Sequence, residues 1–170
     1  MKCSRTWYLV LTMMTGCQGQ KDVGLEPKPG AAKDAAVHSH ERGKMLIADC
    51  GPYHALLTAH LSQKDGNELD IFFETQDAKS PRPVALTLES FTAQVTVDGG
   101  EPKELRFDPA PATERPAGEK SGTCSHFVAK APWMKSTDSL YVVAKLAIDG
   151  NPQTVRWADF NPKKFAHHED

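Results

Sequence analysis

The sequence predicts an all-β fold, an antiparallel β-sandwich of the immunoglobulin-like kind that follows a signal peptide and a flexible tether. Three observations lead to this class. Apolar and polar residues alternate over short segments from residue 45 onward, as they do in strands with one buried face. Turn residues separate these segments at regular spacing, which is typical of sandwiches. The same part of the chain has little of the apolar period that marks an amphipathic helix.

The N-terminal residues 1–16 have the features of an export signal. Lys2 and Arg5 form its positive end, and the apolar run that follows is too short to span a bilayer as a helix. The tripeptide Met-Thr-Gly then directly precedes Cys17, so the segment resembles the signal of a bacterial lipoprotein. This resemblance implies that Cys17 is the lipidated first residue of the mature chain. An ordinary secretory signal would instead leave Cys17 unmodified.

Residues 17–40 are predicted to be the lipidated cysteine and a flexible linker, and residues 41–170 the β-sandwich domain. The linker is polar and contains Gly, Pro and Ala without a period, as flexible tethers do. Gln18 follows the cysteine, and the absence of Asp there favours sorting to the outer rather than the inner membrane. The expected location is therefore the cell envelope, with the domain facing the periplasm and the membrane contacted through the lipid.

The first predicted hairpin joins residues 53–61 to residues 68–74. Odd positions of both segments are apolar and form one face. A three-residue loop with a left-handed Gly66 keeps the two apolar faces on the same side of the hairpin. This register pairs Leu61 with Leu69, Ala59 with Ile71 and Leu57 with Phe73, and it places His60 opposite Asp70.

Two further hairpins follow in the chain. Residues 91–97 are predicted to pair with residues 105–107 through Gly99-Gly100, and residues 140–148 with residues 155–157 through Gly150-Asn151. Between them, residues 108–123 have no period, and such a long irregular segment is either a solvated loop or a functional one.

The cysteines predict a disulfide. The sequence has 4 cysteines, of which Cys3 leaves with the signal and Cys17 would carry lipid. In an oxidising compartment the remaining pair, Cys50 and Cys124, is expected to be linked. The bond would close a loop of about 74 residues and contribute roughly 4 kcal/mol in the chain-entropy model.

Charge and motifs exclude several functions. The formal net charge is -2, and no basic patch indicates a nucleic-acid partner. The chain has no phosphate-binding glycine loop, nucleophile elbow, H-E-x-x-H or C-x-x-C motif, so we do not expect an enzyme. Cys124 and His126 do not make a thiol and base pair, because a strand would hold them about 6.6 Å apart along one face.

Histidines supply the candidate binding residues. Imidazoles and carboxylates are the ligands that Zn and Cu prefer, and histidine-rich termini are typical of metal-binding exported chains. The predicted ligands are His38, His40, His54, His126, His167 and His168. His60 is instead interpreted as half of a surface pair with Asp70.

A family resemblance suggests a cellular context for the protein. The run HSHERGKMLIADCGPYHALLTAHL at residues 38–61, with TVDGGEPKELRF and SHFVAK later in the chain, resembles a group of small exported bacterial β-domain proteins with a Tyr-His-Ala strand. Similar domains accompany the adaptor subunits of resistance-nodulation-division heavy-metal efflux pumps. The resemblance implies an accessory role in metal efflux, with such an adaptor as a partner. Leu56 stands where the group more often has an acid.

Two functions are consistent with the sequence. The first is a lipid-anchored, non-catalytic domain that binds Cu or Zn. The alternative is a ligand-free protein-interaction domain in the cell envelope, which would present a sheet face or the segment 108–123 to another protein.

Overall fold

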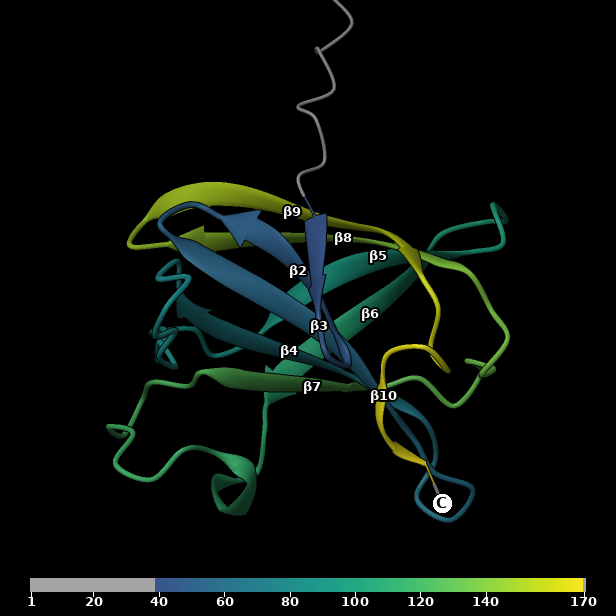
Figure 1. Ribbon diagram of the computed structural model, residues 1–170, viewed down its shortest axis with the longest axis horizontal. Coiled ribbons are helices and arrows are strands. Elements are labelled where there is room, and N and C mark those ends of the chain that lie inside the picture. Colours follow the sequence, from purple (N-terminus) through teal and green to yellow (C-terminus); the bar gives the residue numbers. More distant parts are fainter. Residues whose placement is uncertain (1–38, 170) are drawn as a thin grey trace, which may run out of the picture. The chain divides into compact units, whose positions relative to one another are not determined.

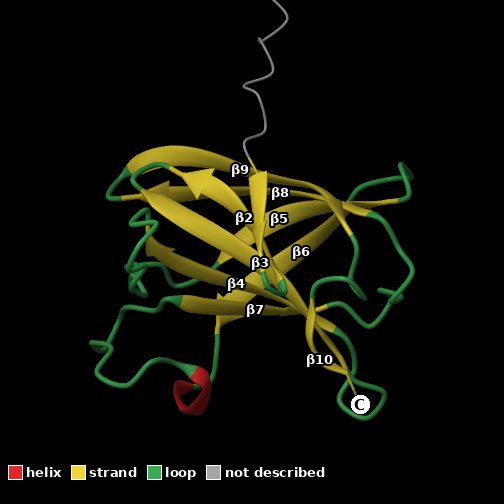
Figure 2. Cartoon of the chain, viewed as in Figure 1, coloured by secondary structure: helices red, strands yellow, loops and turns green. Residues whose placement is uncertain are grey.

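The computed structural model describes residues 39–169 of the chain, and this part consists of strands, connecting loops and one short helical turn (Figure 2). The all-β prediction is confirmed. The signal segment 1–16, Cys17, His38 and most of the predicted linker lie outside the described residues.

The elements follow one another with short connections in most places. They are β1 (Ser39–Arg42), β2 (Met45–Cys50), β3 (Tyr53–Leu61), β4 (Glu68–Thr75), β5 (Phe91–Val97), β6 (Lys103–Pro109), the 3-10 helix η1 (Ala112–Glu114), β7 (His126–Lys130), β8 (Leu140–Ile148), β9 (Asn151–Phe160) and β10 (Ala166–Glu169).

The strands form one curled sheet that folds into two layers, as an antiparallel sandwich requires (Figure 1). Its order is β1-β2-β3-β4-β7-β6-β5-β8-β9, and β10 pairs with β3 in parallel. Strands β6 and β7 share only two residue pairs, at Asp108 and Pro109. The sheet turns at this junction, so β2, β3, β4 and β7 face β5, β6, β8 and β9 across the core.

The core is built from the apolar alternate positions of both layers, as the sequence pattern predicts. Ala55, Leu57 and Ala59 of β3 are fully buried, and Trp157 of β9 lies opposite them with no exposed surface. The indole N–H of Trp157 donates a hydrogen bond to the carbonyl oxygen of Ala55 at 3.2 Å. This contact ties the last long strand to the first layer, and it satisfies the one polar group of the buried ring.

The β8–β9 hairpin turns one residue earlier than predicted, at Asp149-Gly150 rather than at Gly150-Asn151. Ile148 pairs with Asn151, so the two central residues of the turn are Asp149 and Gly150, with φ angles of 49° and 79°. Positive φ at both positions defines the type I′ turn that matches the twist of paired strands, and Asp-Gly is among its preferred sequences.

The register of the β3–β4 hairpin differs from the predicted one by two residues. Odd positions still face the core, but Ala59 pairs with Leu69, and His60 pairs with Glu68 rather than with Asp70. The loop is longer than three residues, because the Asn67 side chain accepts a hydrogen bond from the backbone N–H of Ser62 at 3.1 Å. Gly66 is left-handed, with φ 81°, as predicted.

Cys50 and Cys124 are both buried free thiols, so the predicted disulfide does not form in this structure. Cys50 ends β2, whereas Cys124 pairs with Leu86 on the far side of β4. Three strand spacings separate them, roughly 14 Å along the sheet, and a disulfide needs Cα atoms within about 7 Å. Burial raises the pKa of Cys50 from 9.0 to about 12, which keeps that thiol protonated.

The irregular segment 108–123 is tied to the sheet at its end. The Glu119 carboxylate accepts hydrogen bonds from the backbone N–H of Ser125, at 3.0 Å, and from the Ser125 hydroxyl. The Glu114 carbonyl lies 3.2 Å from Nδ1 of His126. The segment is therefore a docked loop that forms one wall of the region described next.

Candidate functional site

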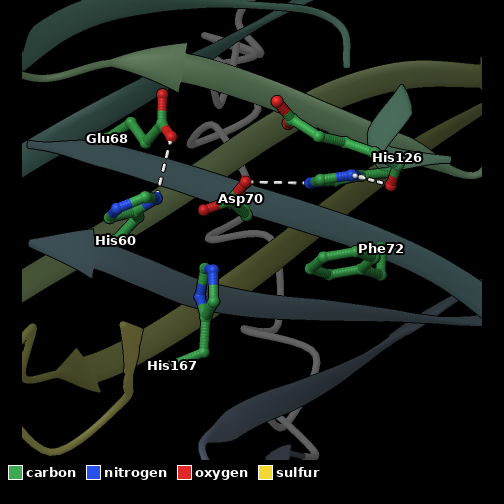
Figure 3. Close-up of a pocket in the computed structure, with 7 residues that line it drawn as sticks. His60, Glu68, Asp70, Phe72, His126 and His167 are labelled. Carbon is green, nitrogen blue, oxygen red and sulfur yellow. Dashed lines mark hydrogen bonds and ion pairs between the residues drawn. The ribbon is translucent and has the colours of Figure 1, made fainter. Parts of the chain in front are cut away.

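The candidate site lies on the face of β3, β4 and β7 that points away from the core. Alternate residues of these strands project there, and together with the C-terminal strand they line a cavity of about 570 Å³ (Figure 3). Its lining residues are His60, Glu68, Asp70, Phe72, Glu114, His126 and His167. Three histidines and three acidic residues from five different elements meet around this space.

Asp70 and His126 form a buried pair at the centre of this cavity. Oδ1 of Asp70 lies 2.8 Å from Nε2 of His126, and the two side chains are 4% and 7% exposed. Nδ1 of His126 faces the Glu114 carbonyl at 3.2 Å, and the ring stacks on Phe72 with centroids 4.0 Å apart. Both nitrogens of His126 therefore face oxygen acceptors, which fixes the orientation of its ring.

The second carboxylate oxygen of Asp70 has no partner among the residues that the structure describes. Oδ2 is buried, and no described hydrogen-bond donor reaches it. An unsatisfied charged oxygen is costly to bury, so this atom is suited to a cation or a donor supplied from outside the chain. Figure 3 shows Asp70 between His126 on one side and His60 and His167 on the other.

His60 enters the cavity from β3 and is oriented by Glu68. Its Nδ1 lies 3.2 Å from Oε1 of Glu68, while Oε2 of Glu68 lies 2.7 Å from Nζ of Lys130. The hydrogen bond to Glu68 raises the pKa of Lys130. Lys130 thus balances the charge of Glu68, and Asp70 is the acid of the cavity whose remaining oxygen faces no donor.

His167 reaches the same cavity from the other end of the sequence. Its ring lies edge-on to that of His60, with centroids 5.5 Å apart, and its Nδ1 is 3.4 Å from the hydroxyl of Thr58. The placement depends on Phe165, whose carbonyl accepts a hydrogen bond from Thr58 at 2.6 Å and whose buried ring stacks on Phe160.

The predicted ligands divide into two groups. His126 and His167 line the cavity, whereas His40 and His54 lie together elsewhere, with ring centroids 5.3 Å apart. The backbone of His168 pairs with that of His60, while its side chain, like the whole of His38, is outside the described part of the chain.

His60 is the cavity residue that the sequence interpretation missed. We assigned it to a surface pair with Asp70, but its cross-strand neighbour is Glu68. The signal was its place on the polar face of a strand that alternates with apolar residues. Cys124 and His126 also differ from prediction, because Cys124 packs in the core while His126 lines the cavity on the opposite face.

The cavity has one fixed candidate ligand for a metal ion, and another would have to move. Among the side chains that the structure describes, no three from His, Cys, Asp or Glu already form a set that could hold one. Asp70 is buried and fixed, whereas His167 is exposed, so its side chain can rotate towards the carboxylate. Two imidazoles and one carboxylate suit Zn(II) or Cu(II).

Comparison of the chain with protein-family models, with curated proteins and with solved structures gave no match. In the part of the chain that the structure describes, no helix has the length and apolar character needed to cross a membrane. The same residues include one exposed large hydrophobic side chain, Tyr141 at 40%. Functional inference therefore depends on the cavity and its charges.

Proposed function

We propose that this protein is a lipid-anchored component of the bacterial cell envelope whose β-domain binds one Zn(II) or Cu(II) ion in the cavity of His60, Asp70 and His167. The role is non-catalytic. The observation that carries the proposal is the buried Oδ2 of Asp70, which has no hydrogen-bond partner in the described part of the chain and faces a space shared with these two histidines.

The surrounding contacts support metal ligation. His126 holds Asp70 through Oδ1, and Glu68 contacts Nδ1 of His60. Outer-shell contacts of this kind orient metal ligands and raise their basicity. His167 is the ligand that moves to reach the ion. Fixing this residue costs about 1–2 kcal/mol of conformational entropy, which lowers the net affinity for the metal. Ligation requires neutral imidazole, so affinity decreases as pH falls.

The envelope setting rests on the sequence. The export signal and Cys17 support lipid anchoring, and Gln18 supports the outer membrane. The resemblance to domains that accompany heavy-metal efflux adaptors supports an accessory role in metal efflux, with such an adaptor as the protein partner. Neither an enzymatic activity nor a nucleic-acid partner is part of the proposal.

The test is metal titration of the full-length chain in detergent. The chain is purified with an affinity tag that contains no histidines. Isothermal titration with Zn(II) and with Cu(II) should show stoichiometric binding near neutral pH. The variants D70N and H60A/H167A should each lose one equivalent, because they remove the buried oxygen or both imidazoles. E104Q, an exposed carboxylate in the other layer, is the matched control and should bind as the parent does.

Two results would contradict the proposal. If the parent binds neither metal, the cavity is not a metal site and the ligand-free interaction domain becomes the better interpretation. If D70N and H60A/H167A bind as many equivalents as the parent, the metal is held elsewhere on the chain.

A further inference from the structure

A second group of metal-ligand side chains lies at the other end of β3 on the same outer face. Asp49 of β2, His54 of β3 and Glu74 of β4 are direct cross-strand neighbours. His40 of β1 completes the group, because its ring contacts that of His54 edge-on, with centroids 5.3 Å apart. None of these residues lines the cavity around Asp70.

The separations in this group are longer than hydrogen bonds. Nε2 of His54 is 3.6 Å from Oδ1 of Asp49, and Nδ1 of His54 is 3.8 Å from Oε1 of Glu74. N–H···O hydrogen bonds have lengths of about 2.7–3.2 Å. Two ligands of one tetrahedral zinc ion, each bonded at about 2.0–2.1 Å, lie roughly 3.4 Å apart. The spacing is therefore closer to that of two metal ligands than to that of a hydrogen-bonded pair.

Glu74 supplies an independent sign of a missing partner. Its Oε1 is buried and has no hydrogen-bond partner among the described residues, and the residue as a whole is 8% exposed. Arg42 holds the other oxygen, Oε2, at 2.6 Å. The carboxylate is thus fixed through one oxygen and presents the other towards Nδ1 of His54, which repeats the arrangement of Asp70.

We propose that His40, His54 and Glu74 form a second, separate site for a divalent transition-metal ion. Glu74 and His54 provide fixed ligands, and exposed His40 rotates to complete the set. His54 and His60 are six residues apart on one strand, about 20 Å, so one ion cannot serve both sites. The chain then holds two ions on one face. This inference stands on residues other than those of the proposed function.

Stoichiometry with Zn(II) alone, measured on the full-length chain by isothermal titration, tests the second site. The parent should bind two equivalents, and H40A should bind one. H40A is the decisive variant because His40 is exposed, so its replacement leaves the core intact. E74Q should also bind one equivalent, with circular dichroism to establish that it is folded. E104Q, the exposed carboxylate of the other layer, is the matched control and should retain two. D49N tests whether Asp49, which faces Nε2 of His54 rather than Nδ1, is a ligand in place of Glu74.

The outcomes separate the two sites. If H40A and folded E74Q still bind as many equivalents as the parent, the second site is refuted. If D49N loses an equivalent and E74Q does not, Glu74 is not the ligand and the assignment is overturned. If the parent binds one equivalent that H40A removes and H60A/H167A does not, the second site is supported while the site at Asp70 fails.

Discussion

Replacing His126 with Phe should destabilise the domain strongly, although the ring remains. Phe preserves the stacking on Phe72, whose centroid lies 4.0 Å from that of His126, but it removes the contact to Asp70 at 2.8 Å. Asp70 would then be a buried carboxylate, 4% exposed, with neither oxygen paired. Breaking one side of a buried charged pair costs about 3–5 kcal/mol.

A double variant separates charge from packing. H126F/D70L removes both partners and fills the space with apolar atoms, and such replacements are often neutral or stabilising. We expect its free energy of unfolding to return to within about 1 kcal/mol of the parent. With the D70L single variant, H126F and the double variant complete the cycle that gives the coupling energy between the two side chains.

Urea denaturation followed by tryptophan fluorescence provides the measurement, since Trp157 is fully buried. With a denaturant slope of about 1–3 kcal/mol per molar, H126F should lower the midpoint by roughly 2 M. A change of less than about 1 kcal/mol in H126F would refute the reasoning, because it would mean that water already solvates the carboxylate.

Three further predictions concern other parts of the chain. F165A should cost about 3–5 kcal/mol, as large core truncations do, and should make β10 accessible to proteases; a stable, resistant variant would show that Phe165 does not anchor β10. Because burial raises the pKa of Cys50 to about 12, the unfolded chain loses that proton first. The free energy of unfolding should therefore fall as pH rises above about 9, by up to about 1.4 kcal/mol per unit for this thiol. C50A should have a shallower slope than the parent, because Cys124, whose pKa burial also raises, still contributes; equal slopes from pH 8 to 10.5 would contradict it. C17A should accumulate as precursor and leave the detergent phase, and unchanged membrane retention would rule out lipidation.

Local patterns predicted most of the strands but not how distant ones meet. The apolar alternation at 53–61 gives β3 with its observed bounds, because burial of one face dictates the period of two. The register of β3 on β4 was wrong by two residues, since the Asn67 side chain caps the loop and nothing in the apolar pattern distinguishes a shift of two. Both registers bury the same faces.

The candidate site was harder to predict because its residues meet through pairings without a sequence signal. His167 and His60 become neighbours only because β10 adds to β3 in parallel, and parallel pairing has no adjoining turn to reveal it. The cysteine prediction failed for a related reason. The number of remaining cysteines does not predict how many strands lie between them. Both thiols are buried core residues.

The parallel docking of β10 also sets the order in which the domain can mature. Thr58 and the Phe165 carbonyl that it contacts are 107 residues apart in sequence, so this contact requires residues far apart in the chain to meet, which is slow in folding. Chains emerge from the ribosome N-terminus first, and β10 follows all the other described strands in the sequence. The cavity around Asp70 therefore lacks one wall until β10 has been synthesised. A nascent or C-terminally truncated chain can assemble the core between its layers and still be unable to close this cavity.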